Sequence, residues 1–283
     1  MNEKIIIFLF LLPILSFYIL VWLYPLLLVV LQSFGIPALT TRAEGEYPTL
    51  TYYVTFFSTR YLDYLWFSFW NSLAAVLLAL VTGYFTALIA FIYEFKGKRV
   101  FNMISKIPLF VPYLIAAFMW WLLLTPRGYV YDLLLHLGLI NEQVKLANDP
   151  LGIGIIFANV WMHIPYVMLI SIGTLKVINP ELIEAARVLG ANMRRTVRYV
   201  FIPLSIPGIL ASLQLVFISM FGGFSVAYIL GASFPNYLSV RIFEDAAVLY
   251  KWSFASVGAV IYLVTSLVIT YFYSKITRWG LKV

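Results

Sequence analysis

The chain has 283 residues, of which 63% are hydrophobic and 11% are charged. Soluble domains carry about 25% charged residues, so this composition excludes an ordinary soluble protein and indicates one that spans a membrane. The absence of cysteine excludes disulfides, thiolate metal sites and thiol nucleophiles. The net charge of +7 comes from basic residues in short segments between apolar runs, which favours membrane topology over nucleic-acid binding.

Apolar runs long enough to cross a bilayer recur along the sequence, since a spanning helix needs about 20 residues. The first run exceeds the apolar core of a cleaved signal peptide, which is about 7 to 15 residues long, and is interpreted as a span. Pro112 predicts a kink in the third, because proline removes an intrahelical hydrogen bond. The six predicted spans cover residues 5–31, 65–93, 107–126, 151–175, 204–224 and 252–274.

The stretch between Arg198 and Arg241 carries no charge and is long enough for two crossings. Its second half is dense in turn residues, with glycines at 222 and 223 and the run Gly231 to Asn236. We interpret the stretch as one span followed by a loop or a re-entrant element over residues 225–240. An extra span over those residues remains the alternative.

The basic residues predict which side of the membrane each segment faces. Most of the 19 lysines and arginines fall near the two termini, in the segment 94–106 and in the polar segment 176–203. Cytoplasmic segments carry this excess of positive charge. The pattern therefore places both termini in the cytoplasm. It places residues 34–64 and 127–150 outside, the latter with a short helix over 131–139.

The polar segment after the fourth run begins with a predicted helix. Asn179 suits the N-cap position and Pro180 suits the first helical position. Gly190 suits the position after a helix that adopts a left-handed backbone conformation. Helical spacing predicts an apolar face on this helix with small residues in its middle. It consists of Leu182, Ala185, Ala186 and Leu189.

A second short helix is predicted from residue 193. Its apolar face consists of Met193, Val197, Val200 and Phe201. Arg194, Arg195 and Arg198 lie away from that face. Pro203 and Pro207 are interpreted as closing the segment.

This segment resembles the EAA loop of permease subunits of binding-protein-dependent ABC importers. The resemblance is carried by Glu184-Ala185-Ala186, by Gly190-Ala191 and by the two prolines. It implies an all-α polytopic membrane protein with about six transmembrane helices, forming one transmembrane domain over residues 1–283. The segment 176–203 is then a cytoplasmic coupling-helix hairpin between spans four and five. Leu189 stands where sugar permeases of the family often carry Asp, so the sequence looks more like the polyamine, iron and phosphonate branch.

The resemblance also implies partners and docking residues. In such importers the hairpin docks on an ATPase subunit, where Glu184 pairs with a basic residue. Anionic lipid, at about 1 kcal/mol per basic residue, is the alternative ligand for the arginines. The implied partners are two ATPase subunits that bind ATP and Mg²⁺, a second similar permease, an external solute-binding protein and membrane lipid, in a bacterial or archaeal plasma membrane. The implied docking residues are Glu184, Ala185, Ala186, Arg187, Gly190, Arg194 and Arg195.

The sequence offers little chemistry of its own. It has neither a P-loop nor a His-Glu-x-x-His motif, so we expect no catalysis, resident cofactor or metal site in this chain. The predicted spans have no ionisable acid or base in their interiors apart from histidine, which argues against the alternative of an ion-coupled secondary transporter or channel. Polar residues in the spans either pack helices together or line a path for a polyamine-like solute, with sugar or glycerol phosphate as the alternative. These residues are Asn71, Asn159, His163, Gln214 and Ser219.

Overall fold

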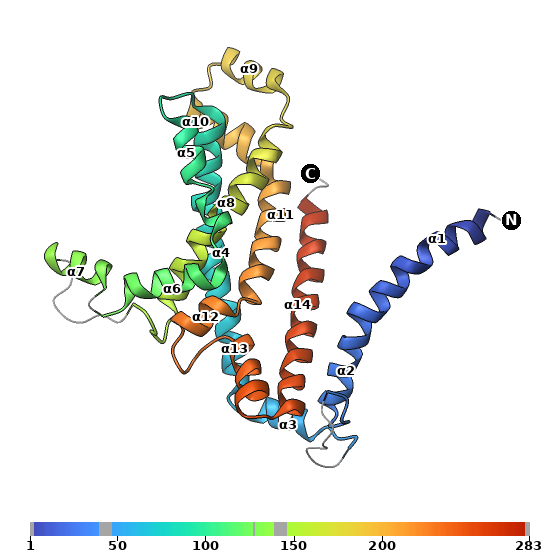
Figure 1. The fold of residues 1–283 in the computed structure, drawn as a ribbon. Coiled ribbons are helices and arrows are strands. Elements are labelled where there is room, and N and C mark those ends of the chain that lie inside the picture. The colour runs from blue at the N-terminus through green and yellow to red at the C-terminus, as the bar shows by residue number, and fades with distance from the viewer. Residues whose placement is uncertain (1–2, 40–46, 127, 139–145, 281–283) are drawn as a thin grey trace. The chain divides into compact units, whose positions relative to one another are not determined.

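The computed structural model describes residues 3–39, 47–126, 128–138 and 146–280, and in that part of the chain every regular element is a helix (Figure 1). The predicted external segments extend over residues 40–46, 127 and 139–145, which lie outside the described residues, as do both chain ends. The chain divides into two compact units. The first comprises Met1–Asp63 and Leu238–Thr265, and the second comprises Tyr64–Tyr237 and Ser266–Val283.

The first unit begins with a long helix of membrane length. It is assembled from α1 (Glu3–Tyr18), a π-helical turn (Ile19–Leu23) and α2 (Tyr24–Ser33). None of its most apolar 18 residues is buried. At the end of this helix Gln32 is buried and donates from Nε2 to Ser253 Oγ at 2.9 Å. The remaining elements of this unit are α3 (Thr51–Ser58), α13 (Leu238–Phe243), a π-helical turn (Glu244–Val248) and the first part of α14 (Trp252–Gly280).

A buried charge network holds the end of α13 in this unit. Arg241 donates from Nη2 to Asp245 Oδ1 at 2.7 Å and to the Tyr61 hydroxyl at 2.8 Å. The Tyr61 hydroxyl in turn donates to Asp245 Oδ2 at 2.9 Å. Asp245 is fully buried. A buried carboxylate is tolerated when it is paired and hydrogen-bonded, and both conditions are met here.

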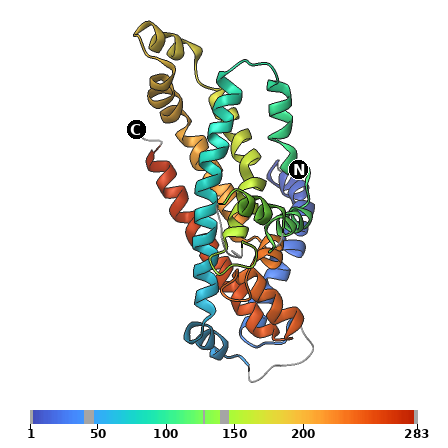
Figure 2. The same ribbon diagram turned by 90° about the vertical axis from the view of Figure 1, so that its left-hand side faces the viewer.

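Three long helices pack together in the second unit. They are α4 (Tyr61–Ile92), α8 (Ile153–Leu175) and α11 (Ile202–Phe221), and they run side by side in Figures 1 and 2. Gly83 of α4 permits a close approach to α8, because a Cβ at that position would lie 2.7 Å from Val167 Cβ and 2.9 Å from the Ile164 carbonyl oxygen. Gly208 of α11 likewise lies against Thr174 of α8. Small residues therefore bring both neighbours onto α8.

The predicted third span is interrupted in the structure. Instead of one kinked helix over 107–126, the chain forms α5 (Lys98–Ile104), a 3₁₀ turn (Ile107–Phe110) and α6 (Tyr113–Leu124). Val111 and Pro112 between them are extended, with ψ of 119° and 141°. Proline forces the preceding residue out of the α region, so the helix breaks rather than bends.

Within the described residues, five helices are long and apolar enough to cross a membrane, so the predicted count of six is not confirmed. The interrupted third segment is the predicted span without a counterpart, because α6 has only 12 residues. The five helices are Phe10–Ser33, Tyr61–Ile92, Ile153–Leu175, Met193–Phe221 and Trp252–Lys275.

Residues 225–240 form no helix of membrane length, which removes the alternative of an extra span. The segment contains α12 (Ser225–Leu230) and an irregular stretch up to Tyr237. Asn148 fixes the end of α12, because its backbone N–H donates to the Leu230 carbonyl at 2.8 Å and its side chain donates to the Gly231 carbonyl at 2.7 Å. The predicted loop is thus a short helix followed by a turn, and hydrogen bonds from Asn148 fix the end of the helix.

The prediction that Pro203 and Pro207 end the hairpin is wrong, because both lie inside the helix that continues into the bundle. That helix runs from α10 (Met193–Thr196) through a π-helical turn (Val197–Phe201) into α11. The Ile202 N–H donates to the Val197 carbonyl, five residues back. Such a widened turn accommodates a missing N–H donor within a membrane helix. The same arrangement precedes Pro25, where the Tyr24 N–H donates to the Ile19 carbonyl.

Candidate functional site

The predicted first helix of the hairpin is confirmed as α9 (Pro180–Val188). Asn179 caps it, with Oδ1 accepting from the Glu181 backbone N–H at 3.0 Å. Gly190 follows with φ of +79°, a left-handed conformation that favours glycine. The local sequence therefore sets both ends of α9.

The outward face of α9 is uncovered by the described residues. Ile183 is the side chain of α9 that packs against the bundle core. The exposed side chains on the opposite side include Glu184, Ala185 and two apolar residues, Val188 and Leu189, which are 88% and 87% exposed. The predicted apolar face therefore turns partly outward, and an acidic, a small and two apolar residues share one exposed surface.

The second hairpin helix has the faces that the sequence predicts. Met193, Val197 and Val200 pack against the bundle core, in which Phe201 is buried. The three arginines on the other side are exposed, as is Arg187 of α9. These arginines are Arg194, Arg195 and Arg198.

Three of the five predicted path residues meet at one place inside the second unit. His163 accepts or donates through both ring nitrogens, with Nδ1 2.8 Å from the Asn159 carbonyl oxygen and Nε2 3.2 Å from Ser219 Oγ. His163 and Asn159 are only 2% and 3% exposed. The cluster joins α8 to α11, and Tyr113 of α6 contributes a hydroxyl 3.5 Å from the same Nε2.

A recess of about 280 Å³ opens beside this polar cluster. The Asn159 side chain lines it and has no hydrogen-bond partner among the described residues. Hydroxyl, amide and aromatic groups make up most of the lining, and no carboxylate is among them. The lining residues are Tyr113, Asn159, Ser219, Gly223, Phe224, Ser225 and Val226.

The structure does not bring Asn71 to the polar cluster. Its side chain donates to the carbonyls of Leu151 and Gly152, both at 3.1 Å, and accepts from the Tyr237 hydroxyl at 2.9 Å. These bonds tie α4 to the residues that precede α8. Asn71 therefore fills the packing role that the sequence left as the alternative.

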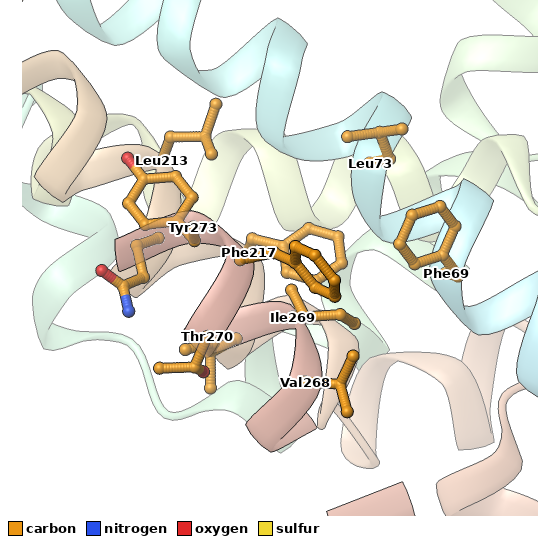
Figure 3. A pocket seen from close by; sticks show the side chains of 11 residues that line it. Phe69, Leu73, Leu213, Phe217, Val268, Ile269, Thr270 and Tyr273 are labelled. Carbon is orange, nitrogen blue, oxygen red and sulfur yellow. The ribbon is translucent and has the colours of Figure 1, made fainter. Parts of the chain in front are cut away.

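Gln214 lines a different and mostly apolar groove of about 370 Å³ (Figure 3). Side chains from α4, α11 and the last part of α14 point into it, among them Phe69, Phe217 and Ile269. Thr270 and Tyr273 are further polar members. Gln214 is therefore separate from the cluster around His163.

Tyr113 and Ser225 of the recess were not predicted from the sequence. Tyr113 begins α6 directly after Pro112, and Ser225 begins α12 directly after Phe224. Both sit at breaks between helices, where polar groups at membrane depth are found when they line a cavity. That signal was present in the turn residues. Among the described residues, no group of three or more His, Asp or Glu is placed to hold a metal ion.

The sequence model of one transporter family matches this chain. The family is described as "Binding-protein-dependent transport system inner membrane component", and residues 79–279 match it. The chain belongs to this family. It is thus a permease subunit of an ABC importer, a multi-pass membrane protein.

One relative of this permease is a spermidine/putrescine transport system permease protein, PotB, from Haemophilus influenzae. The two sequences are 27% identical over 237 residues, which cover 83% of this chain and 81% of that protein. The resemblance therefore extends over most of both chains.

Two solved structures show the same fold. A bacterial alginate ABC transporter in complex with an alginate pentasaccharide-bound periplasmic protein matches with a TM-score of 0.82 and 20% identity, over 98% of this permease and 95% of that chain. The MetNI methionine ABC transporter matches with a TM-score of 0.62 and 18% identity, over 77% of this permease and 95% of that chain.

Proposed function

We propose that α9 docks on a separate ATPase subunit and that its movement reaches the polar cluster of His163 through α8 and α11. The proposal rests on one arrangement. The hairpin lies between the two helices that carry the cluster, with His163 on α8 and Ser219 on α11. Movement of the hairpin would therefore displace both helices, and it would change the hydrogen bond between His163 and Ser219.

The helix that begins with α10 and continues through α11 is suited to transmit this movement. It runs without interruption over Met193–Phe221, a length of 29 residues. At about 1.5 Å per residue it spans roughly 40 Å. Ser219 lies near one end, and Arg194 and Arg195 lie at the other.

The outward face of α9 supports docking on a protein. Val188 and Leu189 are apolar and almost fully exposed, and Ala185 leaves room for a close approach. Glu184 on the same surface supplies a charge that pairs with a basic residue of the ATPase. The proposed docking residues also include Ala186, Arg187, Gly190, Arg194 and Arg195.

The recess of the polar cluster forms part of the solute path in this proposal, and a second similar permease supplies the other half. The solute is polyamine-like, as the similarity to a spermidine/putrescine permease suggests. The Asn159 amide oxygen and the Ser219 hydroxyl accept hydrogen bonds from ammonium groups, and the Tyr113 ring offers a cation–π contact.

A sugar is the second candidate solute. The recess has no carboxylate in its lining, whereas its amide and hydroxyl groups also suit a sugar. The fold match to an alginate transporter is compatible with either solute.

The remaining parts of the proposed assembly follow from the family. Two ATPase subunits bind ATP and Mg²⁺, and an external binding protein delivers the solute, so the permease itself has no ATPase site. The basic segments 94–106 and 176–203 lie at the same end of the second unit (Figure 1), which supports placing both in the cytoplasm. Both termini face the cytoplasm of the bacterial or archaeal cell in this topology.

Charge reversal on α9 tests the docking. Glu184→Lys is expected to abolish solute-stimulated ATP hydrolysis and to weaken co-purification of the ATPase while membrane insertion is unchanged. Glu181→Lys is the matched control on the same helix, and it costs about 0.3–1 kcal/mol through the helix dipole. Wild-type co-purification and hydrolysis in Glu184→Lys would contradict the docking.

The solute is identified by measuring ATP hydrolysis of the reconstituted complex with its binding protein. We expect spermidine or putrescine to raise the hydrolysis rate and an alginate oligosaccharide to leave it unchanged. The reverse result would assign the permease to sugar. Solute flux through the permease alone, without ATPase or ATP, would instead indicate a secondary transporter or channel.

A further inference from the structure

A second exposed surface lies beside α5, in a part of the chain that the proposed function does not use. Glu94, Lys98, Arg99, Asn102, Met103 and Lys106 surround a recess of about 500 Å³, which we name the α5 recess. It follows the end of α4 at Ile92. Because α4 is a helix of membrane length, the α5 recess lies near the boundary of the bilayer.

The α5 recess carries a surplus of positive charge. Lys98 Nζ is 2.6 Å from Glu94 Oε1, so these two residues form an ion pair. Arg99 and Lys106 remain, and neither forms an ion pair with a described residue. Arg99 and Lys106 are thus available to bind an anion in the α5 recess.

Exposed apolar side chains lie directly beside these cations. Val100, Met103 and Ile104 share the i, i+3, i+4 spacing of one helical face and are 57%, 63% and 60% exposed. Phe110, in the turn that follows, is 84% exposed. Phe101 faces the other way and packs against the bundle core. The outer side of this segment therefore presents a mixed basic and apolar surface.

This combination fits a phospholipid better than a soluble anion. A segment with cations on one side and apolar side chains on the other lies in the membrane interface and is attracted by anionic lipid. A small anion would use Arg99 and Lys106 but would leave Val100, Ile104 and Phe110 in water. A phospholipid covers both groups, with its phosphate on the cations and its acyl chain along the apolar residues.

We propose that the α5 recess binds the headgroup of an anionic phospholipid, with its phosphate contacting Arg99 and Lys106. Asn102 lines the same recess, and its Oδ1 atom has no hydrogen-bond partner among the described residues. A headgroup that carries hydroxyls, such as phosphatidylglycerol, offers this amide a donor. The inference rests on the membrane location of α4 and is independent of docking at α9.

The test measures lipid retained by the intact purified permease. The chain is extracted from nanodiscs of mixed phosphatidylglycerol and phosphatidylcholine, and native mass spectrometry counts the bound lipids. Wild-type protein is expected to retain phosphatidylglycerol preferentially. The double variant Arg99→Gln with Lys106→Gln is expected to bind it roughly 30-fold more weakly, since each basic residue near an anionic surface contributes about 1 kcal/mol.

Two control variants isolate the contribution of the site. Lys176→Gln with Lys251→Gln removes the same charge from two exposed lysines outside the α5 recess and is expected to leave retention unchanged. Arg99→Lys with Lys106→Arg keeps both charges and is expected to restore binding. Equal retention by all variants would overturn the proposal, as would equal retention of the two lipids by the wild-type protein.

Two further measurements separate this ligand from its competitors. Inorganic phosphate added alone is expected not to displace the lipid. Displacement by phosphate would show a small-anion site instead. The ATPase is expected to co-purify normally with the Arg99 and Lys106 double variant. Loss of the ATPase with unchanged lipid retention would reassign the α5 recess to a protein contact and overturn the proposal.

Discussion

His163 Nε2 lies 3.2 Å from Ser219 Oγ and is the side chain through which α8 meets α11 in the polar cluster. Its other ring nitrogen is held 2.8 Å from the Asn159 carbonyl oxygen. Both nitrogens of the imidazole are thus engaged, which fixes the orientation of the ring. A relative displacement of α8 and α11 would therefore change the hydrogen bonds of His163.

Replacement of His163 by alanine is expected to uncouple ATP hydrolysis from solute. The substitution removes a buried hydrogen-bonding group, which costs about 1–3 kcal/mol of stability. We expect the stimulation of ATP hydrolysis by solute to fall while basal hydrolysis persists, as measured in nanodiscs with the binding protein. His136→Ala, at the exposed histidine of α7 (Tyr129–His136), is the control. Full stimulation in His163→Ala would remove the cluster from the coupling route.

Two glycines in the long helices are expected to respond in opposite ways to alanine. At Gly83 the new Cβ meets the Ile164 carbonyl and Val167, so Gly83→Ala is expected to destabilise the permease by about 1–3 kcal/mol. At Gly173 nothing lies within 4 Å of the new Cβ. Gly173→Ala is expected to stabilise by up to about 1 kcal/mol through helix propensity. Thermal unfolding in detergent measures both, and equal melting temperatures would contradict the close packing of α4 on α8.

Removal of Arg241 is expected to destabilise the first unit strongly. Arg241→Met leaves the carboxylate of Asp245 buried without its cation, which costs about 3–5 kcal/mol. The double variant Arg241→Met with Asp245→Leu removes both charges and is expected to recover most of the loss. Thermal unfolding of the two variants provides the comparison. A double variant no more stable than the single one would show that the network acts through something other than charge pairing.

The same network predicts a dependence on pH. Burial raises the pKa of the Asp245 carboxyl, and the Tyr61 hydrogen bond and the Arg241 charge oppose that rise. A folded-state pKa above the ordinary value means that protonation favours the folded state, and this contribution is lost as the pH rises through the folded-state pKa. Without Arg241 the pKa rises further. As the pH rises above the ordinary titration range of a carboxyl group, the free energy of unfolding of Arg241→Met is therefore expected to fall more than that of the wild-type protein. Parallel pH profiles would contradict this assignment.

The cap of α9 is expected to control the order of this helix, which we propose to dock on the ATPase. Asn179→Ala removes the acceptor for the Glu181 N–H and costs about 0.5–2 kcal/mol at that helix end. Hydrogen exchange of the backbone amides over 181–184 is expected to accelerate, whereas exchange in α8 is unchanged. Asn192→Ala, at the cap of α10, is the matched variant and is expected to affect residues 194–196 instead. Unchanged exchange in α9 would show that the helix is held by other contacts.

Features determined by neighbours in the chain could be predicted from the sequence. The ends of α9 follow from Asn179 and Gly190, and both are confirmed. The inward face of the second hairpin helix follows from helical spacing and is confirmed by the packing of Met193 and Val197. In each case the physical cause lies within a few residues.

Features determined by distant partners could not be predicted. Asn71 and Asn159 are both asparagines in long apolar helices, yet Asn71 bonds the residues before α8 whereas Asn159 lines the recess. The sequence does not say which partner each amide finds. Prolines show the same limit, since Pro112 breaks its helix and Pro203 is accommodated by a π turn.

The π turn over Val197–Phe201 also fixes the rotational phase of the hairpin. It holds one residue more than an α-helical turn, and one residue corresponds to about 100° of rotation about the helix axis. Deleting a single residue there would restore α-helical geometry. It would rotate the arginines of α10 by about a quarter of a turn around the helix axis. The direction in which the permease presents α9 and the arginines of α10 is therefore set by one additional residue at the base of α11.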